Sequence, residues 1–147
     1  MLVKQTVDFQ DTSMFHSIIG RAASECNLPP YWVEQAKLVV SQGNALYIEH
    51  TSFGHVHAFL GFNISTHPYT GEKLMMELML YVDKAYRGLG HAEALVAMLE
   101  KLARLHDCDA VVAGSSLHSN AHAKRLYSGL GFKTNYTFRK ELPCAIH

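Results

Sequence analysis

The chain has 147 residues, of which 48% are hydrophobic and 18% are charged, and this composition fits one compact domain with its own core. At this length a folded chain buries roughly two thirds of the surface that its unfolded form exposes, so neither disulfides nor a structural metal is needed. Collagen-like, disordered and disulfide-knotted classes are therefore excluded. The 13 basic residues balance the 13 acidic ones, which leaves no general electrostatic attraction for a nucleic acid.

The charges are unevenly distributed along the chain. Residues 8–49 hold two basic and five acidic side chains, a net charge of −3, whereas residues 84–140 hold nine basic and four acidic ones, a net charge of +5. An anionic ligand is therefore expected to bind the second half of the chain.

The cysteines and the start of the chain indicate a cellular setting. Cys26, Cys108 and Cys144 are far apart and show no C-x-x-C spacing, which argues against a disulfide framework or a zinc site. The first residues do not resemble a secretory leader, and no apolar run approaches the ~20 residues of a membrane span. We expect a soluble, cytoplasmic protein without a membrane partner.

The first half of the chain predicts an opening strand, two helices and three strands. Apolar residues recur at helical spacing up to Cys26, and a second helix begins at Pro30 and stops at Gly43. Segments 45–50 and 56–64 are rich in β-branched and aromatic residues and predict a hairpin. Segment 74–82 is almost continuously apolar, which is typical of a buried central strand.

The second half alternates helices and strands. Segment 91–106 places its leucines on one stripe and predicts a helix, and segment 109–114 predicts a strand. Because one helix connects the strands, we expect 109–114 to pair in parallel with 74–82. A helix ending near Gly129 and an extended segment, 132–142, complete the order β-α-α-β-β-β-α-β-α-β. This order predicts an α/β fold in one domain spanning residues 1–147, a mixed sheet in a three-layer α-β-α sandwich.

The first motif with chemical content lies where the buried strand passes into a helix, Arg87-Gly88-Leu89-Gly90-His91-Ala92. Its glycines let the backbone approach a phosphate, and the unpaired N–H groups at the helix N-terminus attract anions. Arg87 adds a permanent positive charge beside them. A plain turn is the alternative interpretation, and the pattern does not fit the dinucleotide fingerprint, because no later glycine follows at the required spacing.

The second motif, N-x-x-A-x-x-L-Y-x-x-L-G-F, covers residues 120–132. In this order, and separated by a helix and a strand, the two motifs resemble those of the GNAT superfamily of acetyl-CoA-dependent N-acetyltransferases. The resemblance extends over residues 74–132, while residues 1–73 match only in the order of elements. It implies that residues 74–132 form an acetyl-CoA-binding core and that residues 1–73 form a variable, acceptor-side half.

The resemblance also implies which residues bind acetyl-CoA. Backbone amides of the glycine turn are expected to hold the pyrophosphate, and the main chain of the central strand is expected to bond the pantetheine arm as an added strand. Two positions of the second motif are expected to contact that arm, and its tyrosine is expected to lie beside the sulfur. The residues concerned are Arg87, Gly88, Leu89, Gly90, His91 and Ala92 for the pyrophosphate, Leu80, Tyr81, Val82, Asn120 and Ala123 for the arm, and Tyr127 for the sulfur.

Two residues are candidates for catalysis. Tyr127 can act as general acid toward the leaving thiolate. A phenol has a reference pKa near 10, above the value near 8.5 of a thiol, so the phenol remains protonated and can donate to the sulfur. Glu77 is the one acid in the central strand and is the candidate base for the acceptor ammonium. A two-residue period places it with Met79 and Tyr81 unless a bulge changes its face, and a role at the rim or in a structural pair is the alternative.

Histidines suggest a metal site only weakly. His55 and His57 share a strand face, and His118 and His122 are four residues apart, but neither pair has a third ligand at a defined spacing. We therefore expect no metal.

The sequence thus predicts an enzyme that transfers acetyl from acetyl-CoA to a primary amine by direct attack in a ternary complex. The acceptor is a small-molecule amine or a lysine or N-terminal amine of a protein, and a homodimer is left open. The alternative is a non-catalytic module that binds coenzyme A for regulation.

Overall fold

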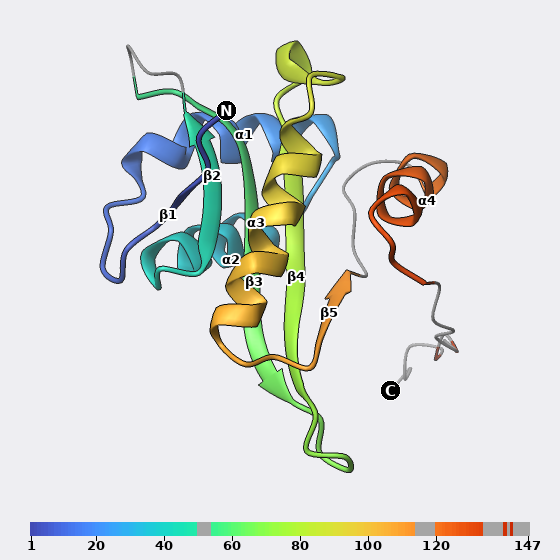
Figure 1. Ribbon diagram of the computed structural model, residues 1–147. Coiled ribbons are helices and arrows are strands. Elements are labelled where there is room, and N and C mark those ends of the chain that lie inside the picture. Colours follow the sequence, from blue (N-terminus) through green and yellow to red (C-terminus); the bar gives the residue numbers. More distant parts are fainter. Residues whose placement is uncertain (50–53, 114–119, 134–139, 141, 143–147) are drawn as a thin grey trace.

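The structure of the chain, a computed structural model, describes residues 1–49, 54–113, 120–133, 140 and 142 (Figure 1). Two short 3-10 turns cover Ser13–Phe15 and Lys84–Tyr86. No helix in these ranges is long and apolar enough to cross a membrane. The remaining elements are, in chain order, β1 (Lys4–Gln5), α1 (His16–Glu25), α2 (Pro30–Ser41), β2 (Ala45–Glu49), β3 (Val56–Thr66), β4 (Lys73–Val82), α3 (His91–Leu105), β5 (Ala110–Ala113) and α4 (Asn120–Gly129).

The strands form one mixed sheet in the order β1-β2-β3-β4-β5. Neighbouring strands are antiparallel from β1 to β4, and β5 is parallel to β4. The predicted α/β fold and the predicted parallel pair are therefore confirmed. Most of the last predicted strand, segment 132–142, lies outside the described residues.

Helices cover both faces of the sheet and bury two separate apolar clusters. On one face, the 3-10 turn before α1, α1 itself and α2 pack on the sheet through Phe15, Ile18 and Val40 respectively, all fully buried. On the other face, α3 packs through Leu95 and Leu99. Figure 1 shows α4 beside the sheet, and its apolar side chains pack against the second cluster. These two layers around one sheet match the three-layer prediction.

A bulge interrupts the pairing of β3 and β4. Gly61 pairs with Met79, whereas Phe62 pairs with Glu77, so Leu78 is the extra residue on β4. The extra residue reverses the alternation of side chains. Met79 packs in the cluster under α1 and α2, and Glu77, two residues from Met75 of the α3 cluster, faces α3 and α4. A strict two-residue period would put Glu77 on the face of Met79 and Tyr81, and the bulge, which the sequence left open, places it on the opposite face.

Gly61 provides a test of the packing at this bulge. A Cβ at Gly61 would lie 2.9 Å from Cγ of Met79 and 3.1 Å from Cγ2 of Val39 on α2. Gly61→Ala should therefore lower the free energy of unfolding by about 1–3 kcal/mol through overpacking, measured by urea denaturation. Gly20→Ala in α1 is the control: nothing lies within 4 Å of that position, so the better helix propensity of alanine should raise stability by up to about 1 kcal/mol. Equal stability of the two variants would contradict this packing.

Candidate active site

The centre of the site is a fork between β4 and β5. Their described pairing ends at Glu77 with Ala113, while β4 continues to Val82 and stays paired with β3 on its other edge. In the described part of the chain, residues 78–82 therefore have an open edge on the side of β5. Of the predicted arm-binding residues, Leu80 and Val82 turn their main-chain polar groups toward this edge, which can pair with an extended ligand as a strand would. The main chain of Tyr81 faces β3, because hydrogen-bonded pairs alternate along an antiparallel ladder and Asp83 N–H donates to the His57 carbonyl.

The glycine turn joins this edge to α3. Gly88 and Gly90 have φ angles of 80° and 87°, a conformation that glycine adopts without a steric penalty. Nothing lies within 4 Å of a Cβ at either position. None of the backbone N–H groups of residues 87–92 donates a hydrogen bond to another described residue. These donors and the positive end of α3 together suit a phosphate group.

The Arg87 side chain turns into the protein. Its Nε donates to the carbonyl oxygen of Val82 at 3.1 Å, and its terminal nitrogen lies 2.6 Å from Oε1 of Glu25, the last residue of α1. The guanidinium also lies over the Tyr81 ring, 5.6 Å from its centroid. Sequence reasoning expected this charge beside the anion, whereas the structure places it in contacts that tie the turn to α1.

Glu25 is a functional candidate that the sequence did not reveal. Its second carboxylate oxygen accepts a hydrogen bond from the Tyr81 hydroxyl, and this bond, together with Arg87, lowers the pKa of Glu25. Burial and the same carboxylate raise the pKa of Tyr81. One turn earlier in α1, Arg21 lies 3.1 Å from Asp83. No local motif marks Glu25, because its partners come from distant parts of the chain.

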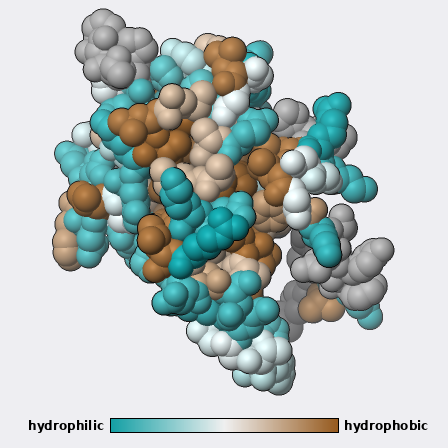
Figure 2. All heavy atoms as spheres, in the orientation of Figure 1, coloured by the Kyte–Doolittle hydropathy of each residue, from teal (hydrophilic) through white to brown (hydrophobic). Residues whose placement is uncertain are grey.

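The two predicted catalytic residues lie together at the fork. Glu77 is 4% exposed, which rules out a position at the rim. The Tyr127 hydroxyl is buried as well, and burial, followed by the nearby charge of Glu77, raises the pKa of Tyr127. The Tyr127 ring meets Phe132 edge-on at 5.3 Å. Figure 2 shows hydrophobic residues at the surface between α3 and α4.

Three ring side chains, those of His57, Tyr86 and His91, pack together next to the glycine turn. His57 and Tyr86 stack with ring centroids 3.6 Å apart, and His91 lies 5.8 Å from Tyr86. Burial lowers the pKa of His91, so its ring is uncharged at neutral pH. Among the described residues, no group of three or more His, Cys, Asp or Glu side chains could hold a metal ion.

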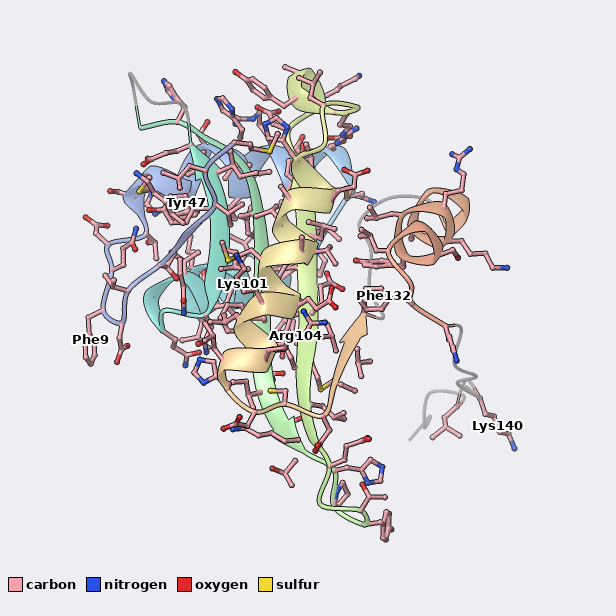
Figure 3. All side chains as sticks on the ribbon, viewed as in Figure 1. Phe9, Tyr47, Lys101, Arg104, Phe132 and Lys140 are labelled. Atoms are coloured by element: carbon pink, nitrogen blue, oxygen red, sulfur yellow. The ribbon has the colours of Figure 1, made fainter. Side chains whose placement is uncertain are left out.

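The second motif is placed only in part. Asn120 begins α4 and Ala123 is half-buried in its first turn, but the side chains of residues 120–122 lie outside the described part, and so does His118. A hollow of about 340 Å³ lies elsewhere, between the C-terminal half of α3, the start of β5 and residues 130–133. Arg104 and Phe132 border it (Figure 3). Because it is at the opposite end of α3 from the glycine turn, it is not part of this site.

The comparisons with known proteins agree with this geometry. The family model of the acetyltransferase (GNAT) family matches residues 12–132. The chain belongs to the GNAT acetyltransferase family. No curated protein matches its sequence.

Several solved acetyltransferases share the fold of this GNAT chain. A Trypanosoma brucei acetyltransferase is 21% identical, with a TM-score of 0.71 over 96% of this chain and 100% of its own. A ribosomal-protein-alanine N-acetyltransferase from Brucella melitensis biovar Abortus is 17% identical, with a TM-score of 0.71 over 97% and 99%. AAC(6')-Iy, solved with a bisubstrate analogue of coenzyme A, is 15% identical, with a TM-score of 0.70 over 97% and 98%.

The lowered pKa of Glu25 predicts a pH dependence of stability. Its ordinary value is 4.5, so the unfolded chain takes up a proton there before the native protein does. The stabilisation is therefore complete above this value and is lost as the pH falls through the native pKa. Between about pH 5 and pH 3, the unfolding free energy of the unmodified protein should fall more steeply than that of Glu25→Gln. Equal slopes in urea titrations at each pH would contradict the contacts of Glu25.

Proposed function

We propose that this GNAT protein transfers the acetyl group of acetyl-CoA to a primary amine by direct attack within a ternary complex. The observation that carries the proposal is the fork, where the open edge of β4 leads from a buried carboxylate and phenol to a turn of unpaired N–H groups. An extended thioester with a diphosphate at its far end is complementary to this arrangement.

The coenzyme would lie along β4 with its diphosphate at the glycine turn. The N–H groups of residues 87–92 would hold the diphosphate, and the outward main-chain groups of Leu80 and the N–H of Val82 would bond the pantetheine arm. Asn120 and Ala123, at the start of α4, would contact the arm from the other side. This placement brings the thioester to the fork, beside Tyr127.

Tyr127 would stabilise the leaving thiolate. The buried phenol remains protonated at neutral pH because its pKa is raised. A thiol has a reference pKa near 8.5, so complete proton transfer from this phenol to the thiolate is uphill. Tyr127 therefore acts mainly through a hydrogen bond that strengthens as charge develops on the sulfur, which is how a donor lowers a barrier.

Glu77 would serve as the base for the acceptor. An acceptor amine arrives as ammonium and must lose a proton before it attacks the carbonyl carbon. Glu77 is the acid at the end of the described β4–β5 pairing, so its carboxylate lies where the amine and the thioester would meet. The amine nitrogen then bonds to the acetyl carbon, the carbon–sulfur bond breaks, and the thiolate leaves.

The class of acceptor amine is proposed from two observations, the similar folds and the charge of the first half of the chain. Two similar folds belong to an acetyltransferase that acts on ribosomal-protein alanine and to an aminoglycoside acetyltransferase, so both protein and small-molecule amines are candidates. Residues 8–49 carry a net charge of −3, which favours a cationic acceptor. A non-catalytic module that binds coenzyme A is the alternative, and the burial of an acid, Glu77, near a phenol, Tyr127, argues against it.

A thiol-release assay with acetyl-CoA and a panel of polyamines, aminoglycosides and peptides tests this function. We expect amine-dependent release of coenzyme A with at least one class, together with a rise in melting temperature on addition of acetyl-CoA, because a ligand of the native state stabilises it. Stabilisation without thiol release would favour the regulatory module. If acetyl-CoA caused neither thiol release nor a rise in melting temperature, the proposal would be overturned.

Tyr127→Phe tests the role of the phenol. The variant should lower kcat by roughly 100-fold, because it removes a donor to the leaving group, and it should leave the Kd of acetyl-CoA within about twofold, a change of less than ~0.5 kcal/mol. Tyr69→Phe, at a tyrosine that is 93% exposed, is the matched control and should retain full activity. Equal turnover of the two variants would remove this assignment.

A further inference from the structure

One carboxylate, on Glu25, contacts both parts of the proposed coenzyme site. We propose that Glu25 is a positioning residue, which holds Arg87 and Tyr81 so that the glycine turn and the edge of β4 are arranged before acetyl-CoA binds. This inference rests on the proposed function, because it assigns Glu25 a part in binding that same coenzyme. It concerns a residue outside both sequence motifs.

The glycine turn has few contacts of its own. Gly88 and Gly90 have no side chains to pack, and Leu89 between them is 61% exposed. Tyr86 N–H donates to the carbonyl of Asp83 before the turn, and Ala94 N–H donates to the carbonyl of Gly90 after it. Between these two points, the described side chains that hold the turn are Arg87 and the buried His91, which packs near Tyr86, and of these two Arg87 is the one that links the turn to α1.

Arg87 in turn depends on its partners. Its Nε bond to the Val82 carbonyl closes the turn onto the end of β4, and its terminal nitrogen is paired with Glu25 at 2.6 Å. A guanidinium can make both contacts at once because its donors form a rigid planar fork. Glu25 also accepts the Tyr81 hydroxyl, so the same carboxylate fixes the strand and the turn.

Fixing the turn in advance should improve affinity. A glycine-rich segment has many accessible conformations, and binding a diphosphate through its backbone requires one of them. Conformational freedom that is lost during folding does not have to be lost during binding. Without Glu25 the coenzyme should therefore bind more weakly, while turnover at saturation changes little, because Glu25 lies on α1 and not at the fork.

Calorimetric titration with acetyl-CoA tests this role. We expect Glu25→Gln to raise the Kd about threefold to fivefold, the ratio that corresponds to one partly exposed ion pair. Glu34→Gln is the matched control: it makes the same chemical change on α2, where Glu34 pairs with Lys37 at 3.7 Å, and it should leave the Kd unchanged. Arg87→Gln should weaken binding at least as much, and the double variant should be no weaker than Arg87→Gln alone, because both residues act through one contact.

Steady-state kinetics separates positioning from a general folding defect. Glu25→Gln should raise the KM for acetyl-CoA and keep kcat within about twofold, whereas a smaller folded fraction would lower kcat and leave KM unchanged. A Kd equal to that of the unmodified protein, additive effects in the double variant, or a fall in kcat alone would each overturn the inference while leaving the proposed function intact. Failure of the unmodified protein to bind acetyl-CoA would overturn both.

Discussion

The structure depends on the point at which β4 stops pairing with β5. Four pairs join the strands, from Leu74 with Ala110 to Glu77 with Ala113, and the bulge at Leu78 then bends β4 and increases its twist. Beyond the bulge, Leu80, Tyr81 and Val82 are at most 4% exposed, yet their edge toward β5 has no partner strand in the described residues. Buried backbone polar groups without partners are costly. A ligand that pairs along this edge would remove that cost, and the proposed coenzyme site lies there, next to the bulge.

In the proposed complex, the attraction for the diphosphate would come from the backbone. Arg87, the charged residue of the glycine turn, is engaged by Glu25 and the Val82 carbonyl, and buried His91 is uncharged at neutral pH. The groups that remain available to attract the diphosphate are the backbone N–H groups of the glycine turn and of the first turn of α3. Such donors have fixed directions, so they select a phosphate by its shape as well as its charge. The side chains around them then serve to hold the backbone in place.

Much of this architecture was predictable because it follows from local patterns. The helical spacing from Phe15 to Cys26, the apolar run of β4 and the glycine turn each determine a local structure, and the single helix between β4 and β5 forces their parallel pairing. The face of Glu77 was not predictable, since a bulge depends on the packing of both strands. The contact of Glu25 with Arg87 was not predictable either, because it exists only after α1 has packed beside the end of β4.

Hydrogen–deuterium exchange of the backbone amides, measured with and without saturating acetyl-CoA, would show where the coenzyme binds. If the coenzyme pairs with the open edge of β4 and its diphosphate binds the turn, exchange should slow most in peptides that cover residues 78–92. Unchanged exchange there, with protection confined to the hollow beside Arg104 and Phe132, would contradict the account.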